Sequence, residues 1–279
     1  MISQNTILEA REIIKSAEAI LITAGAGMGV DSGLPDFRGN EGFWNAYPPI
    51  RHLGISFYEM ANPVWFEQNP KLAWAFYGHR LNLYRKTTPH DGFSRLLQLV
   101  RDKQYNYFIF TSNVDGHFQK AGFFDDKIEE CHGSINHFQC RKPCSDAIWD
   151  ASAIKVIVDE TKFEALEPLP RCAKCGSIAR PNVLMFGDWL WNGERTQQQS
   201  ERFSEWFDQV ISNKQKLVII EAGAGTAVAT VRHLSERIAS SSNTTLIRIN
   251  PRDSHVPEGH LSIPLTAAEG IRQITDSVI

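Results

Sequence analysis

Two pairs of cysteines are the clearest sign of chemistry in the sequence. Cys140 and Cys144 are separated by three residues, and Cys172 and Cys175 by two. Such close pairs aim two thiolates at one ion, and four cysteines complete the tetrahedral coordination that zinc prefers. Because no coordination position remains open for a substrate, we expect one structural zinc ion. The alternative is four unrelated thiols. The fifth cysteine, Cys131, is expected to be a small buried residue in a strand.

A glycine-rich turn at residues 25–29 points to a nucleotide. It directly follows the short apolar run Ala19 to Thr23 and precedes an expected helix. In this order of strand, turn and helix, backbone N–H groups of the turn can approach a pyrophosphate at the helix N-terminus. The dinucleotide fingerprint is incomplete, because Val30 stands where the fingerprint has its third glycine. A tight turn between a strand and a helix is therefore the alternative.

The loop from Asp31 to Gly39 favours a bound ligand. Gly33 and Pro35 prevent a regular helix there. Asp36 and Arg38 place opposite charges on either side of an aromatic residue. A polar loop this close to a phosphate-type turn more often holds a ligand than serves as a plain connection. Arginine is also the side chain best suited to bind a pyrophosphate.

A second polar turn follows the expected strand Tyr107 to Thr111 and contains Asn113 and Asp115. The carboxyl ends of parallel strands line the ligand crevice of a doubly wound sheet. Both side chains would therefore face the same crevice as Arg38. An Asx-turn that caps the next helix is the alternative.

Further strand ends carry candidate functional groups. His132 follows the short strand Ile128 to Cys131, and it is a candidate general base because the ordinary pKa of histidine lies near physiological pH. The chain has nine histidines, so the residue type alone does not identify the base. His132 is favoured by its position at the end of a strand. Gly223 and Asn250 follow two later strands and are candidates for nucleotide binding. Residues 180–188 form either a plain return strand or an exposed edge that pairs with an extended peptide.

In their order along the chain, these motifs resemble the sirtuin (Sir2) family over nearly its whole length. The segments that carry the resemblance are Gly25-Ala26-Gly27, Ser32-Gly33-Leu34-Pro35-Asp36-Phe37-Arg38-Gly39, Asn113-Val114-Asp115, His132-Gly133, the cysteine pairs, and Arg180-Pro181-Asn182-Val183 with Phe186-Gly187. The resemblance implies an NAD-dependent protein deacylase of a divergent bacterial-type branch, with a Rossmann-like large domain and a small zinc domain. It also implies an acylated lysine of a protein as substrate, and free lysine, nicotinamide and O-acyl-ADP-ribose as products.

The resemblance assigns roles to single residues. His132 would act as general base on the ribose hydroxyls, and Asn113 and Asp115 would hold the nicotinamide-ribose end of NAD. The residues that would contact NAD are Ala24, Gly25, Gly27, Asp36, Phe37, Arg38, Ser112, Asn113, Asp115, Gly223 and Asn250. The residues that would pair with the substrate backbone are Val183, Phe186 and Gly187.

The sequence departs from the family pattern around the expected NAD pocket. Ser112 stands where the family usually has glutamine, which removes a ribose contact. The segment Gly223-Ala224-Gly225 lacks two hydroxyl groups that the family usually has there, and His117-Phe118 replaces the usual Leu-His. We therefore expect an NAD pocket that is altered in detail.

Tyr77 and Arg80 resemble the Tyr-x-x-Arg motif of sirtuins that prefer succinyl-, malonyl- or glutaryl-lysine. Residues three apart on a helix share one face, so both side chains can point into one pocket. The alternative is an aromatic core residue next to a solvated arginine.

Other functions are compatible with parts of this pattern. A protein ADP-ribosyltransferase would not need the retained His132, and an NAD hydrolase would not need the cysteine module or the peptide-pairing segment. A non-enzymatic nucleotide-binding regulator would leave Asn113, Asp115 and His132 together without a purpose. Deacylation is therefore the leading hypothesis.

The apolar runs before these groups lack polar alternation, which is typical of strands in a parallel sheet with helices on both faces. We expect strands at Ala19 to Thr23, Tyr107 to Thr111, Ile128 to Cys131, Leu217 to Glu221, Leu246 to Asn250 and Leu261 to Leu265. We expect helices at Thr6 to Ala17, Gly92 to Val100, Glu201 to Ile211, Val228 to Ala239 and from Ala267 onward. This alternation predicts an α/β fold, a Rossmann-like doubly wound parallel sheet with a helical insertion and a small zinc-binding module.

Length and composition agree with this organisation. The chain has 279 residues, 42% of them hydrophobic and 22% charged, which is ordinary globular composition. We place the NAD-binding domain at 1–41, 86–134 and 181–279, the helical insertion at 42–85 and the zinc module at 135–180. A net charge of −3 argues against a nucleic-acid or anionic-membrane partner. No signal-peptide pattern or long apolar run is present, so we expect a cytoplasmic protein.

Overall fold

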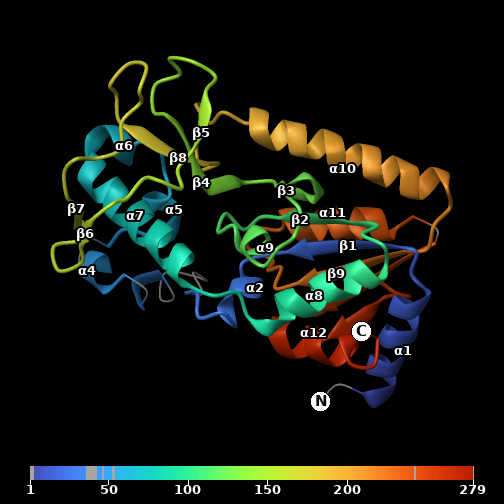
Figure 1. The fold of residues 1–279 in the computed structure, drawn as a ribbon. Coiled ribbons are helices and arrows are strands. Elements are labelled where there is room, and N and C mark those ends of the chain that lie inside the picture. The colour runs from blue at the N-terminus through green and yellow to red at the C-terminus, as the bar shows by residue number, and fades with distance from the viewer. Residues whose placement is uncertain (1–2, 36–42, 46, 52–53, 242, 279) are drawn as a thin grey trace.

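Within residues 3–35, 43–45, 47–51, 54–241 and 243–278, which the structure describes, six parallel strands form a central sheet. Figure 1 shows this sheet in the computed structural model. The strands are β1 (Ala19–Ala24), β2 (Tyr107–Thr111), β3 (Ile128–Glu130), β9 (Leu217–Ala222), β10 (Thr244–Ile249) and β11 (Leu261–Ile263). Their order is β11-β10-β9-β1-β2-β3. Along the chain, β2 and β3 follow β1 on one side, and β9, β10 and β11 then follow on the other side. The strand order therefore reverses between β1 and β9.

Helices cover both faces of this sheet, as Figure 1 shows. On one face lie α1 (Gln4–Ser16), α8 (Asp91–Asp102) and α12 (Ala267–Thr275); on the other lie α10 (Glu194–Ser212) and α11 (Thr230–Ala239). Ile14, Leu96 and Ile271 pack into the apolar cluster of the first face, and Trp206 and Leu234 into that of the second. Every residue of β1, β2 and β9 is buried as a result. The predicted Rossmann-like doubly wound sheet is confirmed. No helix in the described part of the chain has the length and apolar character to span a membrane.

Helix α10 begins earlier than the apolar pattern predicted, at Glu194 instead of Glu201. Its first turns are polar, so no apolar periodicity marked them. Gln199 is nevertheless buried, and its Oε1 accepts a hydrogen bond from the Glu130 N–H of β3 at 3.1 Å. Thr196 donates to the Glu130 carbonyl, also at 3.1 Å. Side chains of α10 thus satisfy backbone groups of the edge strand β3.

The second part of the molecule combines short helices with antiparallel strands. The helices are α4 (Pro48–Arg51), α5 (Phe57–Met60), α6 (Trp65–Gln68) and the longer α7 (Pro70–Lys86). The strands are β4 (Gly133–Cys140), β5 (Ile148–Asp150) and β8 (Ala179–Val183), in the order β5-β4-β8, and the pair β6 (Val158–Asp159) and β7 (Glu164–Ala165). The sequence did not predict an antiparallel sheet, because β5, β6 and β7 have only two or three residues each and β4 pairs with β8, a segment distant along the chain.

One apolar cluster joins α7 to these strands. The Trp74 indole N–H donates to the Ala179 carbonyl at 3.0 Å, and its ring centroid lies 4.9 Å from that of Phe138. At Gly78, an added Cβ would lie 2.4 Å from Val156 Cγ1. Only glycine therefore lets α7 lie this close to the chain that leads into β6 (Figure 1).

Candidate active site

The loops that follow β1 and β9 touch where the strand order reverses. Gly27 N donates to Gly223 O at 3.0 Å, and α2 (Gly27–Val30) begins there. A Cβ on Gly25 would lie 2.7 Å from Ala224 Cα, and a Cβ on Gly223, which has a φ of +67°, would lie 2.2 Å from Met28 N. Both positions therefore require glycine for the loops to meet. In an open α/β sheet, the ligand crevice lies at this point of reversal.

The end of β2 is tied to the same turn. Asn113 Nδ2 donates to Gly25 O at 3.0 Å, and Ser112 N donates to Ala24 O at 3.1 Å. The structure thus brings together several residues that the resemblance assigned to NAD from the first and second strand ends. Those described in this group are Ala24, Gly25, Gly27, Ser112, Asn113 and Gly223. The assigned residues Asp36, Phe37 and Arg38 lie outside the described residues.

Asp115 and Asn250 make local hydrogen bonds that shape their loops. Asp115 Oδ1 accepts the His117 N–H at 2.8 Å where α9 (His117–Lys120) begins, so the Asx-turn considered from the sequence is present. Asn250 is fully buried; its Nδ2 donates to Ala224 O at 2.8 Å, and its Oδ1 accepts Asp253 N at 2.9 Å. Asn250 therefore fastens the loop after β10 to the loop after β9.

His132 lies in the connection between β3 and β4, beside the end of β2. Burial lowers the pKa of His132, and a hydrogen bond to the Ser112 backbone partly opposes this shift. The imidazole is therefore neutral at physiological pH, which is the form that accepts a proton. Its Nε2 lies 3.5 Å from Thr230 Oγ1, at the start of α11. Sequence reasoning did not find Thr230, because only the fold brings it to His132.

Tyr77 and Arg80 are both buried on α7, 1% and 8% exposed, so Arg80 is not a solvated arginine. The Arg80 guanidinium carbon lies 5.2 Å from the ring centroid of Phe76, 5.6 Å from Tyr77 and 5.5 Å from Tyr84. Its Nε donates to the Tyr84 hydroxyl at 2.9 Å. Burial raises the pKa of Tyr77 to about 12, so its phenol keeps its proton. Tyr84 was missed from the sequence, although its position four residues after Arg80 places it on the same helix face.

The segment after β8, which the resemblance assigned to the substrate backbone, is shaped by a buried ion pair. Arg180 and Asp188 form this pair, and Arg180 Nη2 also donates to Val183 O at 2.8 Å. Phe186 N donates to the Ala61 carbonyl of the helical insertion at 2.9 Å. The φ of +67° at Gly187 reverses the chain between Phe186 and Asp188. Sequence reasoning identified this segment but not the ion pair that holds it.

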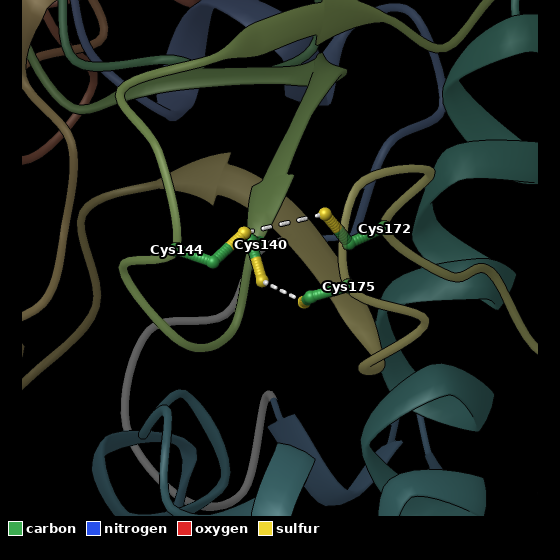
Figure 2. Close-up of side chains that lie close together, drawn as sticks. All are labelled: Cys140, Cys144, Cys172 and Cys175. Carbon is green, nitrogen blue, oxygen red and sulfur yellow. Dashed lines mark hydrogen bonds between the residues drawn. The ribbon is translucent and has the colours of Figure 1, made fainter.

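The four paired cysteines converge at one point, as Figure 2 shows. Their Sγ atoms all lie within 4.8 Å of one another, with 3.6 Å between Cys140 and Cys175 and 3.6 Å between Cys144 and Cys172. Zinc–sulfur bonds of about 2.3 Å place the sulfurs of a tetrahedron roughly 3.8 Å apart, so the donor set fits zinc. Hydrogen bonds from Ser177 lower the pKa of Cys175 to about 6, whereas burial raises the pKa of Cys140 to about 12, so zinc binding would have to displace a proton from Cys140.

Comparisons with known proteins agree with these features. The Sir2 family model matches residues 25–215. The chain is 28% identical to the NAD-dependent protein deacylase of Aquifex aeolicus, over 92% of this chain and 94% of that protein. It is 33% identical to the NAD-dependent protein deacylase of Pyrococcus abyssi, over 66% of this chain and 67% of that protein.

Solved structures share the fold. A complex of a Sir2 homolog with NAD superimposes with a TM-score of 0.69 at 24% identity, covering 100% of this chain and 94% of that chain. A Sir2 variant with a deacetylated p53 peptide and 3′-O-acetyl ADP-ribose has a TM-score of 0.66 at 19% identity, covering 97% of this chain and 98% of that chain. Family match, relatives and fold together place this chain in the Sir2 family, as an NAD-dependent protein deacylase of the sirtuin type with a four-cysteine zinc site.

Proposed function

We propose that this deacylase prefers lysines whose acyl chain ends in a carboxylate, such as succinyl-, malonyl- or glutaryl-lysine. The observation that carries this proposal is the buried guanidinium of Arg80 beside Tyr77 on α7. A guanidinium can bind a carboxylate with two parallel hydrogen bonds, and a phenol can donate a third. These bonds are stronger in an aromatic interior than in water, because the local dielectric is lower.

The roles that we propose for the crevice follow its geometry. The bound NAD supplies the ribose carbon that takes the acyl oxygen as nicotinamide leaves. Asn113 and Asp115 hold the nicotinamide-ribose end, and the glycine turn at Gly25 lies toward the pyrophosphate. His132 accepts a proton from a ribose hydroxyl, a role supported by its lowered pKa and its anchoring to the Ser112 backbone. One water molecule is consumed as the bond between the acyl carbon and the lysine nitrogen breaks, and the products are free lysine, nicotinamide and O-acyl-ADP-ribose.

The substrate in this proposal is an acylated lysine within an extended protein segment. Its backbone lies along Val183, Phe186 and Gly187, next to the Arg180–Asp188 ion pair, although Phe186 N and Val183 O already have partners within the protein. Residues 1–41, 86–134 and 181–279 act as the NAD-binding domain, 42–85 as the acyl-contacting insertion and 135–180 as the zinc module.

Product analysis tests the reaction type. The protein is incubated with NAD and either acetyl- or succinyl-lysine peptide, and the products are identified by mass. Nicotinamide with O-acyl-ADP-ribose and free lysine peptide is the expected set. ADP-ribosylated protein would instead indicate a transferase, and free ADP-ribose without peptide turnover would indicate an NAD hydrolase.

The acyl preference is tested with matched acetyl and succinyl peptides. Wild type is expected to favour succinyl by at least about tenfold in kcat/KM, because a charge-assisted hydrogen bond contributes about 1.5–3 kcal/mol. Arg80→Met is expected to erase this ratio. The control is Lys86→Met, which removes an exposed positive charge from the same helix and should keep the ratio. A wild type that prefers acetyl, with the same ratio in Arg80→Met, would overturn the proposal.

The expected pH dependence of kcat/KM follows from the pKa of His132. The base must be unprotonated to accept a proton, and burial lowers its pKa below the ordinary value of about 6.5. Activity is therefore expected to be lost only on the acid side, with the midpoint of kcat/KM below pH 6.5 and a plateau above it. A profile of kcat/KM from pH 5 to 9 measures this midpoint. A midpoint well above 7 would contradict the environment described for His132.

A further inference from the structure

A cavity of about 520 Å³ lies between α10, β4, α9 and the short helix η1 (Asp125–Lys127), beside the edge strand β3. Among the described residues, none that is assigned to NAD, to the acyl group or to the substrate backbone lines it. Gly116, which does line it, directly follows Asp115, so this cavity and the NAD crevice share a loop. Its volume is typical of pockets that hold small molecules. The cavity is therefore a candidate site that the deacylase reaction leaves unused.

Arg195 of α10 brings an unused hydrogen-bond donor to the lining of this cavity. Its Nη2 donates to Glu130 Oε2 of β3 at 2.6 Å, in an ion pair whose carboxylate side chain is 1% exposed. Nη1 of the same guanidinium is buried and has no hydrogen-bond partner among the described residues. A buried N–H group without an acceptor costs free energy, and an arginine cannot lose its charge to avoid this cost. A carboxylate in the cavity would supply the missing acceptor.

Both signs of charge occur around the cavity. Asp125 and Asp126, which are both exposed, line it together with Arg195 and Arg202. Burial lowers the pKa of His137 to about 4, so this imidazole adds no charge at physiological pH. Two positive and two negative side chains leave the lining without net charge, so a simple anion meets repulsion as well as attraction. A ligand that carries one charge of each sign is complementary to this arrangement.

The rest of the lining is polar. No described aliphatic side chain lines the cavity, so an acyl chain or a nucleobase finds no apolar surface there. Gln199 is 3% exposed, and its Oε1 accepts the Glu130 N–H at 3.1 Å, which leaves its Nε2 to donate to a ligand. The lining side chains that end in an amide are those of Gln119, Asn136, Gln198 and Gln199. Amides both donate and accept hydrogen bonds, so they favour a ligand whose own side chain carries an amide or a hydroxyl.

We propose that this cavity is a second ligand site, which binds a free amino acid with an amide or hydroxyl side chain. The α-carboxylate accepts from Arg195 Nη1, and the α-ammonium donates to Asp125 or Asp126. The side chain of the ligand bonds to the glutamine and asparagine amides. This site does not depend on which acyl group the enzyme removes, so failure of either proposal leaves the other standing.

Calorimetric titration of the full chain with L-glutamine, L-asparagine and L-serine tests the ligand class. NAD is present at saturation, so that its crevice is filled. At least one of the three amino acids is expected to bind. Analogues of the tightest binder that lack either the α-carboxylate or the α-ammonium should bind at least about tenfold more weakly, because each loses a charge-assisted hydrogen bond. For glutamine, these analogues are γ-aminobutyramide and glutaramate.

Arg195→Lys tests the carboxylate contact. It keeps a positive charge beside Glu130, which protects the fold, and it removes the second terminal nitrogen. The amino acid should bind about tenfold more weakly to this variant, and the analogue without a carboxylate as weakly as before. Asp125→Asn combined with Asp126→Asn, at exposed positions, should weaken the amino acid but not the analogue without an ammonium group. Arg237→Lys changes an exposed arginine of α11 outside the cavity and is the matched control, with wild-type affinity expected.

The proposal is overturned if none of the three amino acids binds, or if either analogue binds as tightly as its parent. Loss of binding when NAD is present would also overturn it, since the ligand would then occupy the NAD crevice. Equal affinity of wild type and Arg195→Lys would exclude the contact with Nη1 and the proposal with it. Thermal unfolding midpoints show whether each variant is folded. If Arg195→Lys is not, the double aspartate variant decides the outcome.

Discussion

Replacing His132 with alanine is expected to slow deacylation by about 10²-fold or more, the usual effect of losing a general base. The imidazole is anchored to the Ser112 backbone, and burial lowers its pKa, so it is available in its neutral form. NAD binding should be largely retained, because the glycine turn and the Asn113 bond to Gly25 do not involve the imidazole. Steady-state turnover of acyl peptide and calorimetric titration with NAD measure the two effects separately.

A control for this variant is His233→Ala. His233 is an exposed histidine on α11, the helix that begins at Thr230 beside His132. It should turn over acyl peptide at the wild-type rate. Near-wild-type turnover by His132→Ala would show that the base is another group. A matching loss of NAD affinity would show instead that His132 acts mainly in binding.

Replacing Cys172 with serine is expected to remove the zinc ion and destabilise the antiparallel part of the molecule. Zinc binding contributes about 10–16 kcal/mol to the folding of small zinc-finger peptides, so losing a ligand should lower the unfolding midpoint by roughly 10 °C or more. Activity should fall as well, because β8 belongs to the same sheet as β4 and leads into the proposed substrate segment. Elemental analysis and thermal unfolding of carefully purified protein measure these effects.

Cys131→Ser is the matched control for the zinc site. Cys131 was expected to be a buried strand residue but is half-buried and follows β3; it lies outside the group of four and packs against the apolar cluster under α10 and α11. It should retain one zinc ion per chain. Wild-type protein without stoichiometric zinc, or Cys172→Ser with a full complement, would exclude the four-cysteine assignment.

The parallel sheet could be predicted from the sequence because its central strands β1, β2 and β9 are buried on both faces. Leu217–Ala222 and Tyr107–Thr111 are apolar apart from Glu221 and Thr111 and show no polar alternation, and such runs with helical patterns between them allow few other folds. The antiparallel strands had no comparable signal. Val158–Asp159 and Glu164–Ala165 are too short for periodicity, and β4 pairs with β8 across the intervening cysteine module.

The candidate site was predictable where chemistry follows directly from local spacing. The two cysteine pairs and the turn at Gly25 are recognisable within a few residues. The contacts of Thr230 with His132, and of Asn113 with Gly25, join residues 98 and 88 positions apart, which no local pattern encodes. Tyr84 is an intermediate case. Its spacing from Arg80 is local, but a tyrosine on a largely buried helix usually serves in packing, and only the 2.9 Å bond distinguishes it.

Helix α10 covers the edge strand β3, and this cover affects whether the protein aggregates at high concentration. An uncovered edge of a sheet is a template on which a second polypeptide can add a strand, and such addition starts aggregation. At Glu130, the two backbone groups that a neighbouring strand would need already have partners in Gln199 and Thr196. The polar start of α10 thus works as a barrier to edge-to-edge association, while its apolar remainder contributes to the core.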